Sequence, residues 1–236
     1  MRIPIVICSF NQPTYLMQMC LQWRWYHQDA EKYPIYIFDN GSDIDTVFKG
    51  KLYDTVHTYH YSENNFIPNL TEFLNVHIHP HYSHYVITDP DILIHPATPP
   101  NFLEYFMACI EQGYHRAGFG LIVDDIPEWN FERAMIQGNE RELLTDVVEI
   151  NGVKGYRAPL DTTFCLYSRK RPWTSPMNGQ DWGNCVRMFN AFHLTWYLHH
   201  ENINPEMDNY FKSAKYRVPG QPSAGANNNR PKQYIQ

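Results

Sequence analysis

The stretch Tyr85-Val86-Ile87-Thr88-Asp89-Pro90-Asp91 places two carboxylates directly after a short apolar run. Such a run is typical of a strand covered on both faces in an open α/β sheet, where ligands gather at the carboxyl ends of the strands. Asp89 and Asp91 would point to opposite sides of an ideal strand, but at a strand end they can converge on one hard cation. The pattern therefore predicts a metal site, and a solvated Asp-Pro-Asp turn is the alternative for the tripeptide alone.

Two earlier apolar runs also end in polar residues. Ile3 to Cys8 is followed by Ser9-Phe10-Asn11, and Ile35 to Phe38 is followed by Asp39-Asn40-Gly41-Ser42-Asp43, a dense turn signal. Each run has the length and composition of a buried strand. We therefore expect polar side chains at the ends of three strands of one sheet.

Helical and extended patterns alternate through the first half of the chain. Pro13 opens a helical pattern, and Asn11 or Ser9 is its expected cap. A less buried third strand is predicted over 55–61 and a helix over 69–77, ahead of the strand that carries the two aspartates. This order implies parallel strands joined by right-handed crossovers, and so an α/β fold.

The second half of the chain is less regular. We expect in it a helix over 102–110, a strand over 117–123, an acidic and partly helical excursion over 128–149, a strand over 162–167, a loop over 169–183 and a helix over 205–214.

No break in composition forces a second domain. A single domain is therefore predicted over 1–218, with one half over 1–110 and another over 111–218. The remaining 219–236 is rich in Gly, Pro, Ser and Asn and is predicted to be a flexible tail or linker.

Composition narrows the classes of function. The 236 residues are 43% hydrophobic and 19% charged, as in globular proteins, and the net charge of −6 argues against a general nucleic-acid binder. No apolar run approaches the roughly 20 residues of a membrane-spanning helix, and the first residues read as a strand rather than a signal peptide. The five cysteines are widely spaced and odd in number, which favours reduced thiols and a cytoplasmic location. The oligomeric state is left open.

The order and spacing of three segments carry a resemblance to a known family. Ile5 to Pro13, Ile35 to Ser42 and Tyr85 to Asp91 resemble the corresponding segments of GT-A glycosyltransferases, in particular family-2-like enzymes of bacteria and large DNA viruses. The resemblance covers roughly the first 110 residues well. It implies the GT-A, or nucleotide-diphospho-sugar transferase, fold: an α/β fold with a mostly parallel central sheet flanked by helices.

The resemblance also implies an activity and its cofactors. It implies metal-dependent transfer of one hexosyl or pentosyl group from a nucleotide sugar, with UDP as the expected nucleotide, to a glycan or another hydroxyl acceptor. The implied metal is Mn²⁺ or Mg²⁺. The 17 Tyr, 12 His and 6 Trp are compatible with a carbohydrate or nucleotide cleft. The Gln-x-x-Arg-Trp pattern of processive synthases is missing, which favours transfer of a single sugar over polymer synthesis.

The resemblance assigns nucleotide-binding roles to residues at the strand ends. Ser9 and Asp39 are implied to hold the nucleotide, with Asn11 lining the same cleft and Asn65 contacting the nucleotide from the start of a helix. A structural role is an equal alternative for Asp39, which could start a turn before Gly41. Ser9 and Asn11 could likewise be helix caps.

A metal site is implied at Asp89, Asp91 and His193. Asp91 would bind the metal directly, and Asp89 would bind the metal or the ribose. His193 lies in the segment Phe192 to Tyr197, which is similar to a late His-Leu-x-Trp-Tyr segment of related enzymes. An imidazole is a plausible third ligand for Mn²⁺ beside carboxylates.

A general base on the acceptor side is the least defined part of the hypothesis. If the anomeric configuration inverts, a side chain must take the acceptor hydroxyl proton. Asp124 and Asp125 follow one predicted strand and Asp161 precedes another, so each is a candidate for this role and also a candidate turn residue.

Three alternatives stay open at this point. A sugar-nucleotide nucleotidyltransferase would use a similar sheet and metal, but a Gly-rich basic loop is missing after the first strand. His77, His79 and His81 invite a zinc site, although a solvated loop is the better interpretation. The third is a GT-A-like protein that binds nucleotides or glycans without catalysis.

Overall fold

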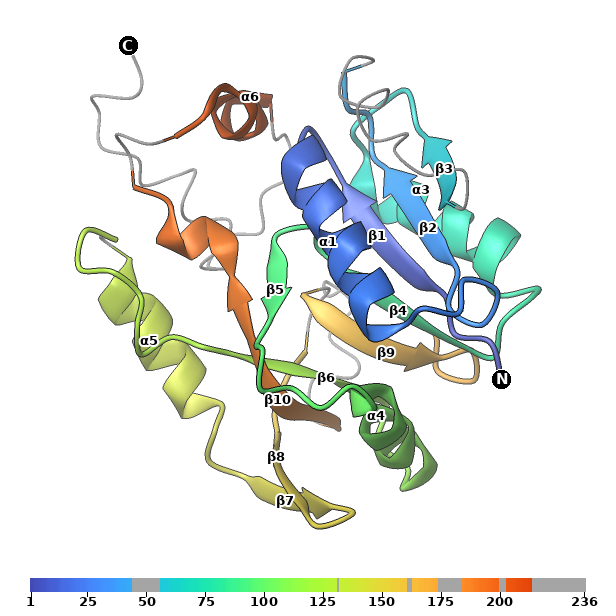
Figure 1. The fold of residues 1–236 in the computed structure, drawn as a ribbon, viewed down its shortest axis with the longest axis vertical. Helices are drawn as coiled ribbons and strands as arrows, with labels where there is room; N and C mark the ends of the chain where they lie inside the picture. The colour runs from blue at the N-terminus through green and yellow to red at the C-terminus, as the bar shows by residue number, and fades with distance from the viewer. Residues whose placement is uncertain (44–55, 131, 161–162, 174–183, 200–202, 214–236) are drawn as a thin grey trace.

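A computed structural model describes residues 1–43, 56–130, 132–160, 163–173, 184–199 and 203–213 (Figure 1). Within these residues the strands form one sheet in the order β3-β2-β1-β4-β9-β6-β10-β8-β7, and β5 pairs with β10 beside it. The strands are β1 (Ile5–Ser9), β2 (Ile35–Asp39), β3 (Val56–His60), β4 (His84–Thr88), β5 (Ile92–Ile94), β6 (Arg116–Leu121), β7 (Val147–Ile150), β8 (Val153–Arg157), β9 (Phe164–Ser168) and β10 (Cys185–His193).

Helices lie between the strands and pack on the sheet. They are α1 (Pro13–Tyr26), α3 (Phe66–Phe73) with a π-helical continuation (Leu74–Ile78), α4 (Phe102–Glu111), α5 (Arg133–Glu142), a 3-10 helix (Leu194–Tyr197) and α6 (Pro205–Ser213). The helix predicted over 69–77 thus begins earlier, at Phe66, and the last helix ends at Ser213.

The strand β1 is buried on both faces, which explains its continuous apolar sequence. Ile5 and Ile7 pack into one hydrophobic cluster with Trp23 of α1, whereas Val6 packs into a second cluster with Phe73 of α3. All five residues of β1 are buried. Because one layer of helices covers each face, alternate side chains of the strand are equally apolar.

The first half of the sheet is parallel, as predicted. β1 pairs in parallel with β2 and β4, and β2 pairs in parallel with β3. The second half is mixed, because β9 is inserted antiparallel between β4 and β6. β10 runs parallel to β6 and antiparallel to β5 and β8. The carboxyl ends of β1, β2, β4, β6 and β10 therefore share one edge of the sheet.

Several elements were not expected from the sequence. The region 128–149 contains α5 and the first strand of the antiparallel hairpin β7–β8, and both β5 and β10 are additional strands. The predicted strand 117–123 ends at Leu121. The tail 219–236 lies outside the described residues, and the single-domain boundaries stay a prediction.

The first helix is capped from a distant part of the chain. Its N-cap residue is Gln12, and neither Asn11 nor Ser9 caps it. The backbone N–H of Thr14 instead donates to Oε1 of Glu206 in α6, at 2.9 Å. The prediction of a local cap was therefore wrong, because the carboxylate that stabilises this helix end comes from the last described helix.

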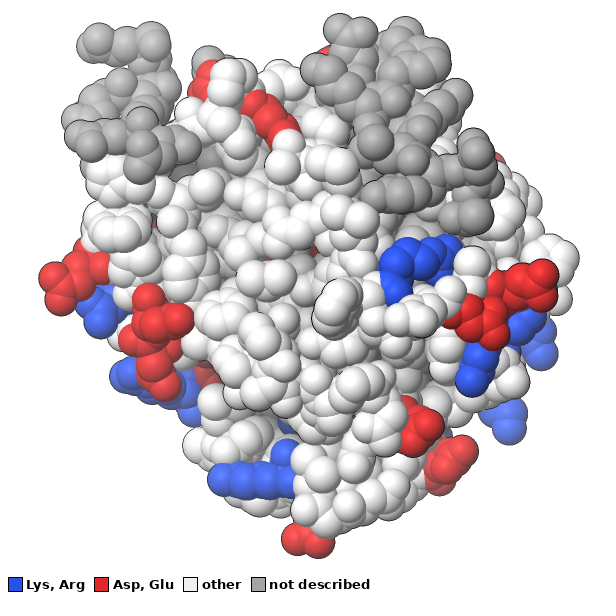
Figure 2. Space-filling view, in the orientation of Figure 1, with Lys and Arg blue, Asp and Glu red and all other residues white. Residues whose placement is uncertain are grey.

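Surface charge, the cysteines and the lengths of the helices also bear on the expectations from the sequence. Figure 2 shows one face whose charged side chains of both signs lie around the periphery, with a largely uncharged centre. The five cysteines are free and buried, as expected for reduced thiols. Among the described helices, none combines the length and the apolar character needed to cross a bilayer.

Candidate metal and nucleotide site

Strand pairing brings the two aspartates and the late histidine together. Asp89 and Asp91 lie in the turn between β4 and β5, and His193 is the last residue of β10. Because β5 pairs antiparallel with β10, Ile92 lies opposite His193, and Asp91 is its immediate neighbour. One potential ligand atom from each of Asp89, Asp91 and His193 lies within 4.8 Å of the other two. We call these three residues the metal group.

The metal group is held by hydrogen bonds from the segment that follows β10. The Thr195 hydroxyl donates to Oδ2 of Asp91 at 3.0 Å and lies 2.7 Å from Nδ1 of His193. The N–H of Leu194 donates to the carbonyl oxygen of Asp91 at 2.8 Å. The His193 ring also stacks on Trp196, with 4.8 Å between centroids. These contacts fix the orientation of a carboxylate and an imidazole that are both almost fully buried.

The donor set fits a divalent cation. Nδ1 of His193 is 3.4 Å from Oδ2 of Asp91, and Asp89 adds a second, partly exposed carboxylate. Two carboxylates and an imidazole suit Mn²⁺, and a bound cation would offset their crowded negative charge. No other group of three potential ligands of this kind occurs in the described ranges.

The negative charge of the metal group contributes to raised pKa values of two tyrosines. Burial, with the carboxylates of Asp91 and Glu206, raises the pKa of Tyr15 to about 12. Burial, with the carboxylates of Asp91 and Asp89, also raises the pKa of Tyr210. A phenol is protonated near neutral pH at its ordinary pKa of about 10, and the raised pKa values keep both side chains neutral to a higher pH. The sequence patterns did not identify Tyr15, Tyr210 or Thr195.

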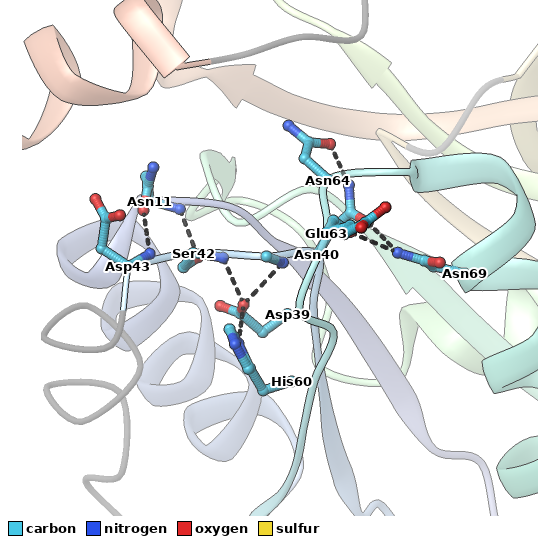
Figure 3. A network of polar contacts seen from close by, with 10 residues as sticks. Asn11, Asp39, Asn40, Ser42, Asp43, His60, Glu63, Asn64 and Asn69 are labelled. Carbon is cyan, nitrogen blue, oxygen red and sulfur yellow. Dashed lines mark hydrogen bonds and ion pairs between the residues drawn. The ribbon is translucent and has the colours of Figure 1, made fainter.

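A second polar cluster lies after β1 and β2 (Figure 3). Oδ1 of Asp39 accepts the backbone N–H groups of Gly41 at 3.2 Å and Ser42 at 2.9 Å, and it lies 2.9 Å from Nδ1 of His60. Asp39 is buried. Its carboxylate therefore starts the turn that ends β2, which is the structural role weighed against nucleotide binding.

Asn11 joins this cluster to the end of β1 and to α6. Its N–H donates to the Ser42 hydroxyl at 2.7 Å, and its side-chain oxygen accepts the N–H of Asp43 at 3.0 Å. Its side-chain amide donates to the Ser213 hydroxyl at 2.9 Å. The backbone of Asn11 has a φ of 51°, in the left-handed region that asparagine tolerates better than most residues. We call Asn11, Asp39, Ser42 and their partners the turn network.

The remaining predicted nucleotide residues differ in their surroundings. Ser9 is buried, and its hydroxyl has no hydrogen-bond partner among the described residues. Asn65 is exposed directly before α3, and its side chain makes no capping hydrogen bond. The neighbouring Asn64 instead accepts from the side chain of Asn40 at 2.7 Å.

The candidate bases lie in different places. Asp124 is exposed and pairs with Arg141 of α5 at 2.7 Å, so it is directed toward the surface helix. Asp125 is also exposed, but its Oδ1 accepts the Tyr197 hydroxyl at 2.5 Å. Tyr197 ends the 3-10 helix that follows His193, so Asp125 is tied to the segment that orients the metal group. Asp161 lies outside the described residues.

The histidine run has structural contacts instead of a shared ligand geometry. The ring of His77 packs against Tyr59, with 4.0 Å between centroids. The two ring nitrogens of His79 lie 3.1 Å from the Asn75 side chain and the Tyr85 hydroxyl. His77 lies in the π-helical continuation of α3, so the predicted solvated loop is wrong at that residue, and the contacts give His77 and His79 structural roles.

Comparison with known proteins finds similarity at the level of structure alone. No protein-family profile and no curated protein sequence matches the chain. A mannosyltransferase from Pyrobaculum calidifontis, solved with GDP-Man and Mn²⁺, is 9% identical at a TM-score of 0.52 and covers 89% of this chain and 59% of its own. The chain has the GT-A fold.

Two further solved structures are similar at lower scores. TarS from S. aureus is 11% identical at a TM-score of 0.47, covering 72% of this chain and 47% of its own. Glucosyl-3-phosphoglycerate synthase from Mycobacterium tuberculosis is 13% identical at 0.43, covering 72% and 57%. The chain thus spans about half to three-fifths of the length of these solved structures. The predicted GT-A fold class is confirmed, and the low identity means that the similarity establishes the fold alone.

Proposed function

We propose that this GT-A protein is a metal-dependent glycosyltransferase that moves one sugar from a nucleoside diphosphate sugar to a hydroxyl group of a glycan or another acceptor. The observation that carries the proposal is the convergence of Asp89, Asp91 and His193 at one edge of the sheet. The ends of β1 and β2 lie at the same edge, where nucleotides bind in open α/β sheets.

Asp91 and His193 would hold Mn²⁺ or Mg²⁺ directly, and Asp89 would bind the metal or the ribose. A bound divalent cation would neutralise the charge that develops on the departing diphosphate. Thr195 orients the carboxylate and the imidazole through its hydroxyl. Second-layer contacts of this kind are needed for a precise ligand geometry.

The nucleotide would lie against the ends of β1 and β2. The buried Ser9 hydroxyl, without a partner in the described part of the chain, supports a polar contact there. Asp39 would support the base through the turn that it holds, because Oδ1 already accepts two backbone N–H groups. Asn65 is the least supported member of this group, since its side chain is exposed.

On the acceptor side, Asp125 is a better candidate base than Asp124. Its contact with Tyr197 links it to the segment after His193, whereas Asp124 is paired with Arg141. Asp161 stays a candidate from the sequence. UDP is the first nucleotide to test, and GDP is the second because the Pyrobaculum calidifontis mannosyltransferase was solved with GDP-Man. The buried free thiols support a cytoplasmic location.

A thermal-shift screen tests this function. UDP, GDP, dTDP and CMP sugars are added with and without Mn²⁺, and release of nucleotide is then followed for any donor that stabilises the protein. Saturating binding at a hundredfold excess over Kd raises stability by about 2.7 kcal/mol. We expect a metal-dependent shift and release of a nucleoside diphosphate with one donor class. Binding without release supports the non-catalytic alternative, and no shift with any donor contradicts the proposal.

A further inference from the structure

The last described helix, α6, contacts the parts of the fold that hold the nucleotide end of the site. Glu206 accepts the Thr14 N–H at the start of α1, and Ser213 accepts the side-chain amide of Asn11. Near the middle of the helix, the side chain of Asn209 donates to Asp43 at 3.1 Å. In Figure 1, α6 lies above the carboxyl end of β1 and the start of α1.

Apolar contacts support the same docking. Met207 is fully buried, and its sulfur lies 3.9 Å from the side-chain amide of Gln12. The Tyr210 ring packs edge-on against Phe10, with 6.3 Å between centroids. Contacts at both ends and in the middle of α6 define its rotation about its own axis. The Tyr210 side chain is therefore held against the turn that follows β1.

The neighbours of Tyr210 link this helix to the metal group. Phe10, against which Tyr210 packs, follows β1, and β1 pairs in parallel with β4, the strand that ends directly before Asp89. The negative charges of Asp91 and Asp89 act on the phenol of Tyr210, and that of Asp91 acts also on Tyr15. Tyr15 follows Thr14, the residue that binds Glu206 of α6. Tyr15 and Tyr210 thus belong to two helices, α1 and α6, that are joined by a hydrogen bond at the end of β1. Protonated hydroxyls are suitable donors to anionic phosphate oxygens.

We propose that α6 completes the donor site and that the Tyr210 hydroxyl is a positioning group that hydrogen-bonds to the diphosphate of the nucleotide. The proposal rests on the proposed function, because it needs a nucleoside diphosphate beside Asp89, Asp91 and His193. The residue acts on the leaving group, so its effect follows the number of phosphates and not the base.

The test compares a nucleoside diphosphate with its monophosphate. The wild-type protein is first screened with UDP, GDP, dTDP and CDP in the presence of Mn²⁺. The Kd of the selected diphosphate and of its monophosphate are then measured by calorimetry for wild type, Tyr210→Phe and Tyr105→Phe. The matched control Tyr105 lies on α4, where its ring packs against Phe189. Tyr210→Phe keeps the ring that contacts Phe10, and its melting temperature without ligand is measured beside wild type, so that a loss of stability is distinguished from a loss of binding.

We expect Tyr210→Phe to weaken binding of the diphosphate about tenfold, because it removes one hydrogen bond to a charged group. The monophosphate should change less than twofold in Kd, and Tyr105→Phe should leave both values unchanged. Equal weakening of both nucleotides, or no weakening of either, overturns the role of Tyr210 while the glycosyltransferase proposal stands. If the wild-type protein binds no nucleotide with Mn²⁺, the proposed function fails and this inference fails with it.

Discussion

The metal group and the turn network lie at the same edge of the sheet but satisfy their polar atoms in different ways. In the turn network, Oδ1 of Asp39 accepts two backbone N–H groups, and the side-chain oxygen of Asn11 accepts a third. In the metal group, by contrast, two buried ligand side chains share the hydroxyl of Thr195. The side-chain oxygens of the turn network thus accept mainly backbone donors, while the metal group places two carboxylates beside each other and beside an imidazole.

This difference separates a structural polar cluster from a ligand site. A carboxylate that collects backbone N–H groups stabilises a turn whether or not a ligand is bound. Two carboxylates placed beside one another, as at Asp89 and Asp91, repel unless a cation offsets their charge. Polar residues at strand ends are therefore better judged by the balance of donors and acceptors around them than by their position alone.

Replacing Asp91 tests the metal group most severely. Asp91→Asn keeps an oxygen that can accept the Thr195 hydroxyl but removes the ligand charge, so we expect Mn²⁺-dependent binding of the nucleoside diphosphate to fall by about a hundredfold or more. Calorimetric titration with Mn²⁺ and nucleotide measures the effect. Asp146→Asn, which removes an exposed carboxylate near β7, is the matched control and should bind as wild type. Wild-type affinity in Asp91→Asn would remove the metal assignment.

Replacing Asp39 tests whether the turn network is structural. Asp39→Ala leaves the N–H groups of Gly41 and Ser42 without their acceptor, and we expect the free energy of unfolding to fall by about 2 kcal/mol. Urea denaturation measures the change. Asp39→Asn keeps an accepting oxygen and should lose less than half as much. If both variants are as stable as wild type while nucleotide binding is lost, the network belongs to the ligand site and the contrast between the two clusters disappears.

Replacing Thr195 tests whether its hydroxyl orients the two buried ligands of the metal group. Thr195→Val keeps the shape of the side chain and removes the hydroxyl shared by Asp91 and His193, so Mn²⁺ affinity should fall about tenfold. Measurement of the metal Kd in the presence of saturating nucleotide reports the effect. Thr71→Val on the exposed face of α3, where the hydroxyl donates to the carbonyl of Ile67, provides the control. An unchanged Kd in Thr195→Val would show that the hydroxyl does not orient the ligands.

The smallest expected effect concerns the cap of α1. Glu206→Ala removes the carboxylate that accepts the Thr14 N–H, and we expect a loss of about 1 kcal/mol in the free energy of unfolding. Glu206→Gln retains an accepting oxygen and should restore most of it. Urea denaturation distinguishes the two variants, and an alanine variant as stable as wild type would contradict a role for α6 in holding α1.

The fold of the first half could be predicted because its determinants are local. Continuous apolar runs followed by turn residues defined β1, β2 and β4, and their spacing implied parallel crossovers. The same patterns placed Asp89 and Asp91 at a strand end, and the family resemblance added His193. The structure shows these three side chains in one group. Their roles stay predictions until they are tested.

The second half could not be predicted in the same way because its determinants are distant or irregular. The ladder between β10 and β6 shifts between Arg187 and Asn190, where Phe189 has a positive φ. This bulge interrupts the alternation of inward and outward side chains from which a strand is predicted. In the first half, β5 was missed for a similar reason: it has three residues and pairs with a strand about 100 positions away, so no local pattern defines it. The cap of α1 is equally non-local, since Glu206 is 192 positions from Thr14.

The hydrogen bond between Thr14 and Glu206 has a practical consequence for spectroscopy. One amide near the beginning of the chain directly senses whether a helix near residue 206 is seated. The solvent exchange rate and the proton chemical shift of this one amide should report whether α6 is in contact with α1, without any label on α6. A single resonance would then report, during a nucleotide titration, how two remote parts of the polypeptide move together.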